Sequence, residues 1–225
     1  MRAAARVVAA PDGDRTALVV LKGEAPLLPR RTGPNEVHFV GGAAGPLGGD
    51  ELRIEIEVGA GAVLHVRTVA ASIALPGRDG AWSRLAVHAS VAAGGTLVWL
   101  PEPLVAAARC RHRAESTVDL EPGATLVWRE ELVRGRHGEP SGEVELSTTV
   151  RRGGRPFHRS DLVLDDSPAV LGGARVFATL VTTKEIDLKI PEIMPLAAGG
   201  TLVTALGREL AETRAITDRL VTPPQ

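Results

Sequence analysis

The segment GGAAGPLGGDEL, residues 41–52, is the first place where residue types and spacing could do chemistry. A phosphate-binding loop needs glycines between a strand and a helix, a lysine for the phosphates, and a serine or threonine for magnesium. Here the glycines are followed by Asp50 and Glu51, and LRIEIEV then alternates as in a half-buried strand. The segment therefore predicts a tight connection that uses positive φ, and no intrinsic nucleotide hydrolysis.

Cys110 and His112 are a second candidate pair, because residues at i and i+2 of a strand share one face. A thiolate and an imidazole on one face could bind a soft metal ion. Two ligands rarely make a stable site, and the arginines at 109, 111 and 113 would repel a cation. The pattern favours an ordinary arginine-rich strand.

Glu130 and Glu131 could in principle serve glycoside chemistry, which uses paired carboxylates. Aromatic residues make up only 3% of the chain and tyrosine is absent, so a sugar subsite lacks stacking platforms. The sequence also has no G-x-S-x-G motif and no α/β pattern to carry a nucleophilic serine. An enzyme acting on a sugar or acyl substrate is kept as the alternative to a binding or scaffolding protein.

Composition narrows the class of protein further. The 225 residues are 44% hydrophobic, which suffices for a real core, and the formal net charge of −1 creates no field for nucleic acid or an anionic membrane. No apolar run approaches the ~20 residues of a membrane span, and Arg6 interrupts the one that could resemble a signal peptide. A single cysteine suits a reducing compartment, so we expect a cytoplasmic protein.

A recurring turn organises the elements that must position these residues. VGAGAVLHV (58–66), VAAGGTLVW (91–99), LEPGATLVW (120–128) and LAAGGTLVT (196–204) share a glycine and a leucine at matching positions. Such recurrence is the signature of stacked units, each of which cannot bury its apolar face alone. The pattern predicts a mostly β protein, a β-helix-like stack of short strands and glycine turns, in a single domain covering 1–225.

Hairpins and one helix complete the expected order of elements. Alternating runs at 5–23 and 142–165 predict hairpins, the first around Pro11 to Asp14 and the second around Gly153 and Gly154. The spacing of apolar residues at 207–221 predicts a C-terminal helix, whereas 165–176 is expected to be a loop.

Several ordered motifs resemble the urease accessory protein UreD family, which is called UreH in some bacteria. They are APLLPRRTGPNEVHFVGGAAGPLGGDEL (25–52), the run from 94 to 139 that contains WLPEP, VDLEPGA and a second tryptophan, and GGRPFHRSDLVLD (153–165). This chain departs from the family pattern at Arg129 and Ser160, where acidic residues are frequent. The resemblance spans nearly the whole chain.

The resemblance implies a nonenzymatic chaperone with a β-helix-like fold. Family members bind a UreF-type protein and, through it, the GTPase UreG, and the assembly docks on apo-urease and delivers nickel to its active site. It further implies no tightly bound cofactor, transient nickel at most, and homodimers only within the accessory complex.

Asp50 and Glu51 are the residues we expect to meet nickel in transit, because carboxylate oxygens could hold the ion weakly. The competing role for Asp50 is structural, since an aspartate in a turn commonly accepts hydrogen bonds from nearby backbone N–H groups.

Overall fold

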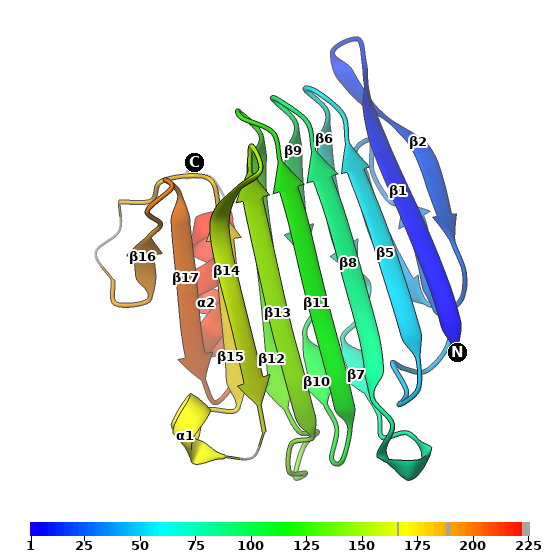
Figure 1. The fold of residues 1–225 in the computed structure, drawn as a ribbon, viewed down its shortest axis with the longest axis vertical. Helices are drawn as coiled ribbons and strands as arrows, with labels where there is room; N and C mark the ends of the chain where they lie inside the picture. Colours follow the sequence, from blue (N-terminus) through cyan, green and yellow to red (C-terminus); the bar gives the residue numbers. More distant parts are fainter. Residues whose placement is uncertain (166, 188–189, 222–225) are drawn as a thin grey trace.

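A computed structural model describes residues 1–165, 167–187 and 190–221, and its strands form two β-sheets arranged as layers (Figure 1). Sheet A comprises β1 (Arg2–Asp12), β2 (Arg15–Gly23), β5 (Glu51–Val58), β8 (Ser83–Val91), β11 (Arg111–Leu120), β13 (Glu143–Arg152) and β14 (Arg155–Leu164). Sheet B comprises β3 (Leu27–Arg31), β4 (Glu36–Gly41), β6 (Val63–Thr68), β7 (Ser72–Ala74), β9 (Thr96–Leu100), β10 (Leu104–Ala106), β12 (Thr125–Arg134), β15 (Val176–Thr182), β16 (Ile193–Pro195) and β17 (Thr201–Gly207).

The chain passes repeatedly from sheet A to sheet B, which confirms the predicted β-helix-like stack. Strands β5, β8, β11 and β13 pair in parallel in sheet A, and β4, β6, β9 and β12 pair in parallel in sheet B. The predicted hairpins are confirmed as the antiparallel pairs β1–β2 and β13–β14. Alternation of buried and exposed residues along β5 is confirmed as well.

The recurring glycines lie at the turns between the sheets, and three of them stack on one another. Gly61, Gly94 and Gly123 have φ of +72°, +70° and +83°, a region that L side chains rarely adopt. A Cβ placed on Gly94 would lie 3.7 Å from the backbone nitrogen of Gly61, and one on Gly123 would lie 3.9 Å from that of Gly94. The fourth copy differs, because Gly199 lies in the turn between the antiparallel strands β16 and β17.

A different pair of glycines explains the connection at 41–50. The backbones of Gly48 and Gly77 touch, so that a Cβ built on Gly77 would lie 2.6 Å from the Cα of Gly48. The Gly48 N–H also donates to the Leu75 carbonyl at 3.1 Å. The glycines of this loop therefore let two loops pack backbone against backbone, between β4 and β5 and between β7 and β8.

The helices are a 3-10 turn at Arg78–Gly80, α1 (Pro168–Leu171) and α2 (Leu210–Val221). The predicted C-terminal helix is confirmed but begins at Leu210, because Gly207 still belongs to β17 and the Glu212 carboxylate accepts the Arg208 N–H at 2.9 Å. The expectation of a loop at 165–176 was wrong in part, since α1 forms one helical turn there. None of the helices in the described ranges is both long and apolar enough to span a membrane.

The core lies between the sheets, and ion pairs cover the outer face of sheet A. Trp99 and Trp128 stack in the core with ring centroids 5.0 Å apart. On the outer face, Arg111 pairs with Glu143 at 3.2 Å and Arg113 with Glu145 at 2.6 Å, each across the β11–β13 register. The predicted arginine-rich strand begins only at Arg111, because Arg109 has φ of +62° and lies with Cys110 in the turn before β11; the charges of Arg111 and Arg113 are matched by the neighbouring strand.

Candidate functional site

A cavity of about 370 Å³ separates part of the two sheets. Its apolar walls include Leu27, Phe39, Ile54, Val87, Trp99 and Leu146. It also contacts Val40 and Ile73, which are partly exposed, so the cavity opens to the surface near the 41–50 loop. Polar lining comes from His112, Ser116 and Glu130, among other residues. This combination of apolar walls and a few polar groups is typical of a binding or transit site.

Glu130 is the carboxylate that β12 turns into this cavity. Its Oε1 accepts hydrogen bonds from Ser116 Oγ at 2.9 Å and from Trp128 Nε1 at 3.2 Å, and its Oε2 accepts one from Thr148 Oγ1 at 2.7 Å. All three donors are neutral, and no ion pair to Glu130 exists among the described residues. The interior therefore holds a carboxylate whose charge is not matched by a basic side chain.

A break in sheet B lies beside Glu130. Strands β6 and β9 pair as far as Arg67 and Leu100, and pairing resumes with Ser72 and Leu104 of β7 and β10. Strand β12 runs straight past the break, pairing with β9 up to Trp128 and with β10 from Leu132. We call this break the window; it is bounded by Thr68, the segment 101–103 and the segment 129–131.

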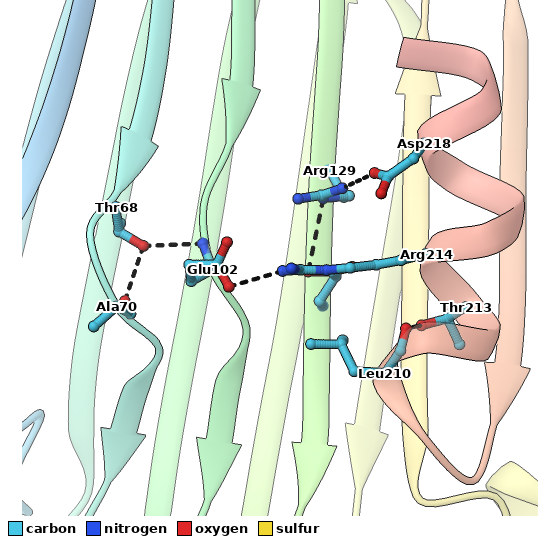
Figure 2. Close-up of polar contacts among 9 residues, drawn as sticks. Thr68, Ala70, Glu102, Arg129, Leu210, Thr213, Arg214 and Asp218 are labelled. Carbon is cyan, nitrogen blue, oxygen red and sulfur yellow. Dashed lines mark hydrogen bonds and ion pairs between the residues drawn. The ribbon is translucent and has the colours of Figure 1, made fainter. Parts of the chain in front are cut away.

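The window is shaped by Thr68 and Glu102. Thr68 Oγ1 accepts the Glu102 N–H at 2.9 Å and donates to the Ala70 carbonyl at 3.0 Å, as Figure 2 shows. Both Glu102 and Glu131 belong to the cavity lining together with Glu130. The cavity thus extends from its apolar mouth to the window.

Helix α2 supplies the groups on the outer side of the window. Arg214 reaches across β12 and donates to Glu131 at 2.8 Å and to Glu102 at 3.0 Å (Figure 2). Arg129 donates to Asp218 at 2.6 Å, and its Nε lies 3.7 Å from Glu131. The hydrogen bond to Glu131 raises the pKa of Arg214 above its ordinary value. Helix α2 is therefore joined to sheet B by two basic and three acidic side chains.

Glu130 and Glu131 do not form the carboxylate pair that glycoside chemistry needs. Glu130 contacts Ser116 and Thr148 of sheet A, whereas Glu131 contacts Arg214 on the opposite face of sheet B. Two carboxylates that flank one glycosidic bond must face the same substrate. The adjacent acidic pair Glu130–Glu131 therefore gives no support to an enzyme that cleaves glycosidic bonds.

Asp50 and Glu51 are not among the residues that line this cavity. Asp50 is 4% exposed. Its Oδ1 accepts a hydrogen bond from the Met1 ammonium at 2.8 Å, and its Oδ2 accepts one from the Leu47 N–H at 2.9 Å. Glu51 is exposed and pairs with Arg2 at 3.1 Å. Asp50 has the contacts expected of its competing structural role, and nickel contact by either residue stays a prediction.

Cys110 and His112 are both buried, but they are not part of a metal cluster. Burial raises the pKa of the Cys110 thiol to about 11, which disfavours the thiolate that binds metals. His112 Nδ1 lies 2.9 Å from Ser83 Oγ, and its Nε2 has no hydrogen-bond partner among the described residues. In the part of the chain that the structure describes, no three Asp, Glu, His or Cys side chains are grouped to hold a metal ion.

We expect His112 to make the protein less stable in acid. Burial lowers the pKa of His112 from 6.5 to about 4, so the unfolded chain binds more protons than the folded one between these values. The free energy of unfolding should fall as the pH drops through this range, by about 3 kcal/mol in total. Urea unfolding at several pH values measures this loss.

The control for this prediction is the His112→Gln variant, because a glutamine side chain does not titrate in this pH range. Its free energy of unfolding should depend less steeply on pH than that of the wild type, because only the contribution of His112 is removed. The pKa values of His65 and His158 are also lowered by burial, but both residues are present in the two proteins and their contributions cancel. Equal slopes for the two proteins would contradict the prediction.

The sequence contained only a weak signal for the window. In TLVWREELVR, Trp128 and Glu130 share the inward face of β12, so an acidic residue at a core position was visible. The partners of Glu131 could not be read from the sequence, because Arg214 is 83 residues away.

Comparison with known proteins identifies the family. The family model described as UreD urease accessory protein matches residues 1–220. A urease accessory protein UreD from Streptomyces avermitilis is 41% identical, with the alignment covering 97% of this chain and 95% of the relative. Urease accessory protein UreD 1 from Saccharopolyspora erythraea is 39% identical over 92% of this chain and 88% of its own length. The stacked β-fold, the motifs and these matches together establish that the chain belongs to the UreD family of urease accessory proteins.

Proposed function

We propose that this protein is a nonenzymatic chaperone that binds apo-urease together with UreF-type and UreG-type proteins and helps deliver nickel to the urease active site. Membership of the UreD family supports the role in urease maturation. The observation that carries the nickel part is the carboxylate of Glu130 inside the cavity, without a basic partner. The protein acts in the cytoplasm and holds no cofactor tightly.

The donors around Glu130 suit a cation that must leave again. Its oxygens are held by neutral hydroxyl and indole donors, so a passing divalent ion would meet a fixed negative group without displacing a salt bridge. Fewer than three grouped ligands would give only weak binding, as transit requires. Asp50 and Glu51 remain candidates for an earlier contact with nickel near the mouth of the cavity.

The proposed partners would also cover edges of the sheets. Strand β14 is an edge strand of sheet A with Val163 53% exposed, and β2 is the opposite edge with Val19 57% exposed. Exposed strand edges associate with other chains unless they are covered. Co-expression with a UreF-type protein should therefore raise the soluble yield, and homodimers should form only within the accessory complex.

Complementation of a strain that lacks its own UreD tests the function. Wild type with its cognate partners should restore urease activity. Glu130→Gln keeps the size of the side chain and one acceptor oxygen but removes its charge, and we expect intact complex with urease nickel reduced about tenfold or more. Complex recovery, urease nickel content and urease activity are measured together.

Asp50→Asn is the matched variant outside the cavity. If Asp50 only holds Met1 and the Leu47 N–H, complex recovery and nickel content should fall in parallel, whereas intact complex with low nickel would support a role in transit. Full nickel loading by Glu130→Gln would remove the cavity from the proposed path. Failure of the wild type to complement would count against the proposed role in nickel delivery as a whole.

A further inference from the structure

Helix α2 is attached to sheet B by charged side chains and by the partly buried Ile216, Leu220 and Val221, which pack against a small apolar cluster. Only Thr213 and Thr217 of this helix are fully buried, whereas Ile216 and Leu220 are half-buried. Beneath the helix, Thr217 Oγ1 and Arg129 Nε are buried without a hydrogen-bond partner in the described part of the chain. Buried polar atoms without partners cost free energy in the closed position and regain water when the helix leaves.

The ion pairs of α2 are open to competition. The Asp218 side chain is 57% exposed and that of Glu102 is 36% exposed, so water and salt reach both outer partners. The inner partners are different: the Glu131 side chain is fully buried and that of Arg129 is 4% exposed. Desolvation of such charges offsets most of the attraction between them. The ion pairs that hold α2 closed therefore contribute only a small net free energy.

Arg214 lies on the outer side of the window and is not among the residues that line the cavity. It pairs with Glu102 and Glu131, which border the cavity, and Glu131 also lies 3.7 Å from Arg129 Nε. While Arg214 stays there, a cation that leaves the cavity through the window meets a guanidinium. When Arg214 leaves, the cation meets the Glu102 carboxylate, while Glu131 keeps Arg129 as its basic neighbour.

We propose that α2 is a latch over the window, held closed by Arg214 and opened when a bound partner offers a carboxylate to this arginine. A partner that binds the open form better shifts the equilibrium by its difference in affinity for the two forms. Opening removes Arg214 from Glu102 and Glu131 on the outer side of the window, so partner binding and cation passage become coupled. The identity of the cation rests on the proposed function, whereas the latch itself does not.

Hydrogen exchange of the full chain tests the latch. Arg214→Gln removes the guanidinium, and we expect backbone amides of residues 210–221 to exchange about tenfold faster or more, with the strands of sheet A unchanged. Arg219→Gln is the matched control, because Arg219 is exposed on the same helix and should leave the rate unchanged. High salt should accelerate exchange of α2 more in the wild type than in Arg214→Gln, which keeps only the Arg129–Asp218 pair. Equal exchange rates in wild type and Arg214→Gln would overturn the latch.

Tryptophan fluorescence separates the latch from the nickel path. Trp128 Nε1 contacts Glu130 and Trp99 stacks on Trp128, so quenching of this pair by Ni²⁺ reports the ion near the Glu130 carboxylate. A Trp82→Phe background removes the tryptophan that lies away from this pair. We expect Arg214→Gln to be quenched about tenfold more efficiently than Arg219→Gln. Faster exchange with unchanged quenching would support the latch and overturn its coupling to the cation path, which is the part taken from the proposed function.

Discussion

Replacing Gly77 with alanine is expected to lower the free energy of unfolding by about 3 kcal/mol, the upper end of what overpacking usually costs. The added Cβ would lie 2.6 Å from the Cα and the carbonyl oxygen of Gly48. Backbone atoms cannot rotate away as the end of a side chain can, so the two loops must separate. Urea unfolding of the purified protein measures the loss.

Gly41→Ala is the matched control for the same region. The nearest atom to a Cβ at Gly41 would be the Ala43 carbonyl oxygen at 3.9 Å, an ordinary contact, and Gly41 is not among the residues with positive φ. This variant should unfold within about 0.5 kcal/mol of the wild type. A loss in Gly77→Ala no larger than in Gly41→Ala would mean that the loop contact is easily relaxed.

The stacked part of the fold could be predicted because its signals are local. A glycine with positive φ followed by alternating residues determines a turn and a strand, and three such units then stack by the same contacts. The same sequence motif around Gly199 has a different role, because its flanking strands pair with each other in an antiparallel hairpin. Local sequence specifies the turn, whereas the partner of each strand depends on the rest of the chain.

The site was harder to predict because its parts meet only in three dimensions. Asp50 drew attention through the glycines before it, yet those glycines are needed for the contact of Gly48 with Gly77. Glu130 lies in an unremarkable strand, and its importance comes from the cavity and from donors on two strands of sheet A. The window arises where β6 and β9 stop pairing while β12 continues, which depends on the register of three strands.

Replacing Glu131 alone is expected to be among the most damaging changes in the protein. Glu131→Met leaves Arg129 buried with Asp218 as its remaining acidic partner, and Arg214 keeps only Glu102. Removing one member of a buried ionic network typically costs about 3–5 kcal/mol, because the remaining charge stays out of water without compensation. Urea unfolding should therefore give a much lower midpoint than for wild type.

Replacing Arg129, Glu131 and Arg214 together is expected to restore most of this stability. In the triple variant Arg129→Met, Glu131→Met and Arg214→Met, no buried charge remains at the site, while Asp218 and Glu102 keep their contact with water. Apolar replacements of whole buried networks are often neutral or stabilising, so the triple variant should unfold within about 1 kcal/mol of the wild type. If the triple variant is as unstable as Glu131→Met, the ion pairs contribute a large net stability and α2 cannot open cheaply.

The triple variant also separates stability from function. Its methionines would hold α2 by apolar packing, which neither salt nor a carboxylate of a partner can compete with, so exchange of residues 210–221 should become independent of salt. If α2 must open during urease maturation, this stable protein should form the accessory complex and still load urease with nickel poorly. The triple variant could instead load urease normally although the backbone amides of its α2 are protected from exchange. Nickel would then not pass through the window, whereas passage through the cavity at Glu130 would not be contradicted.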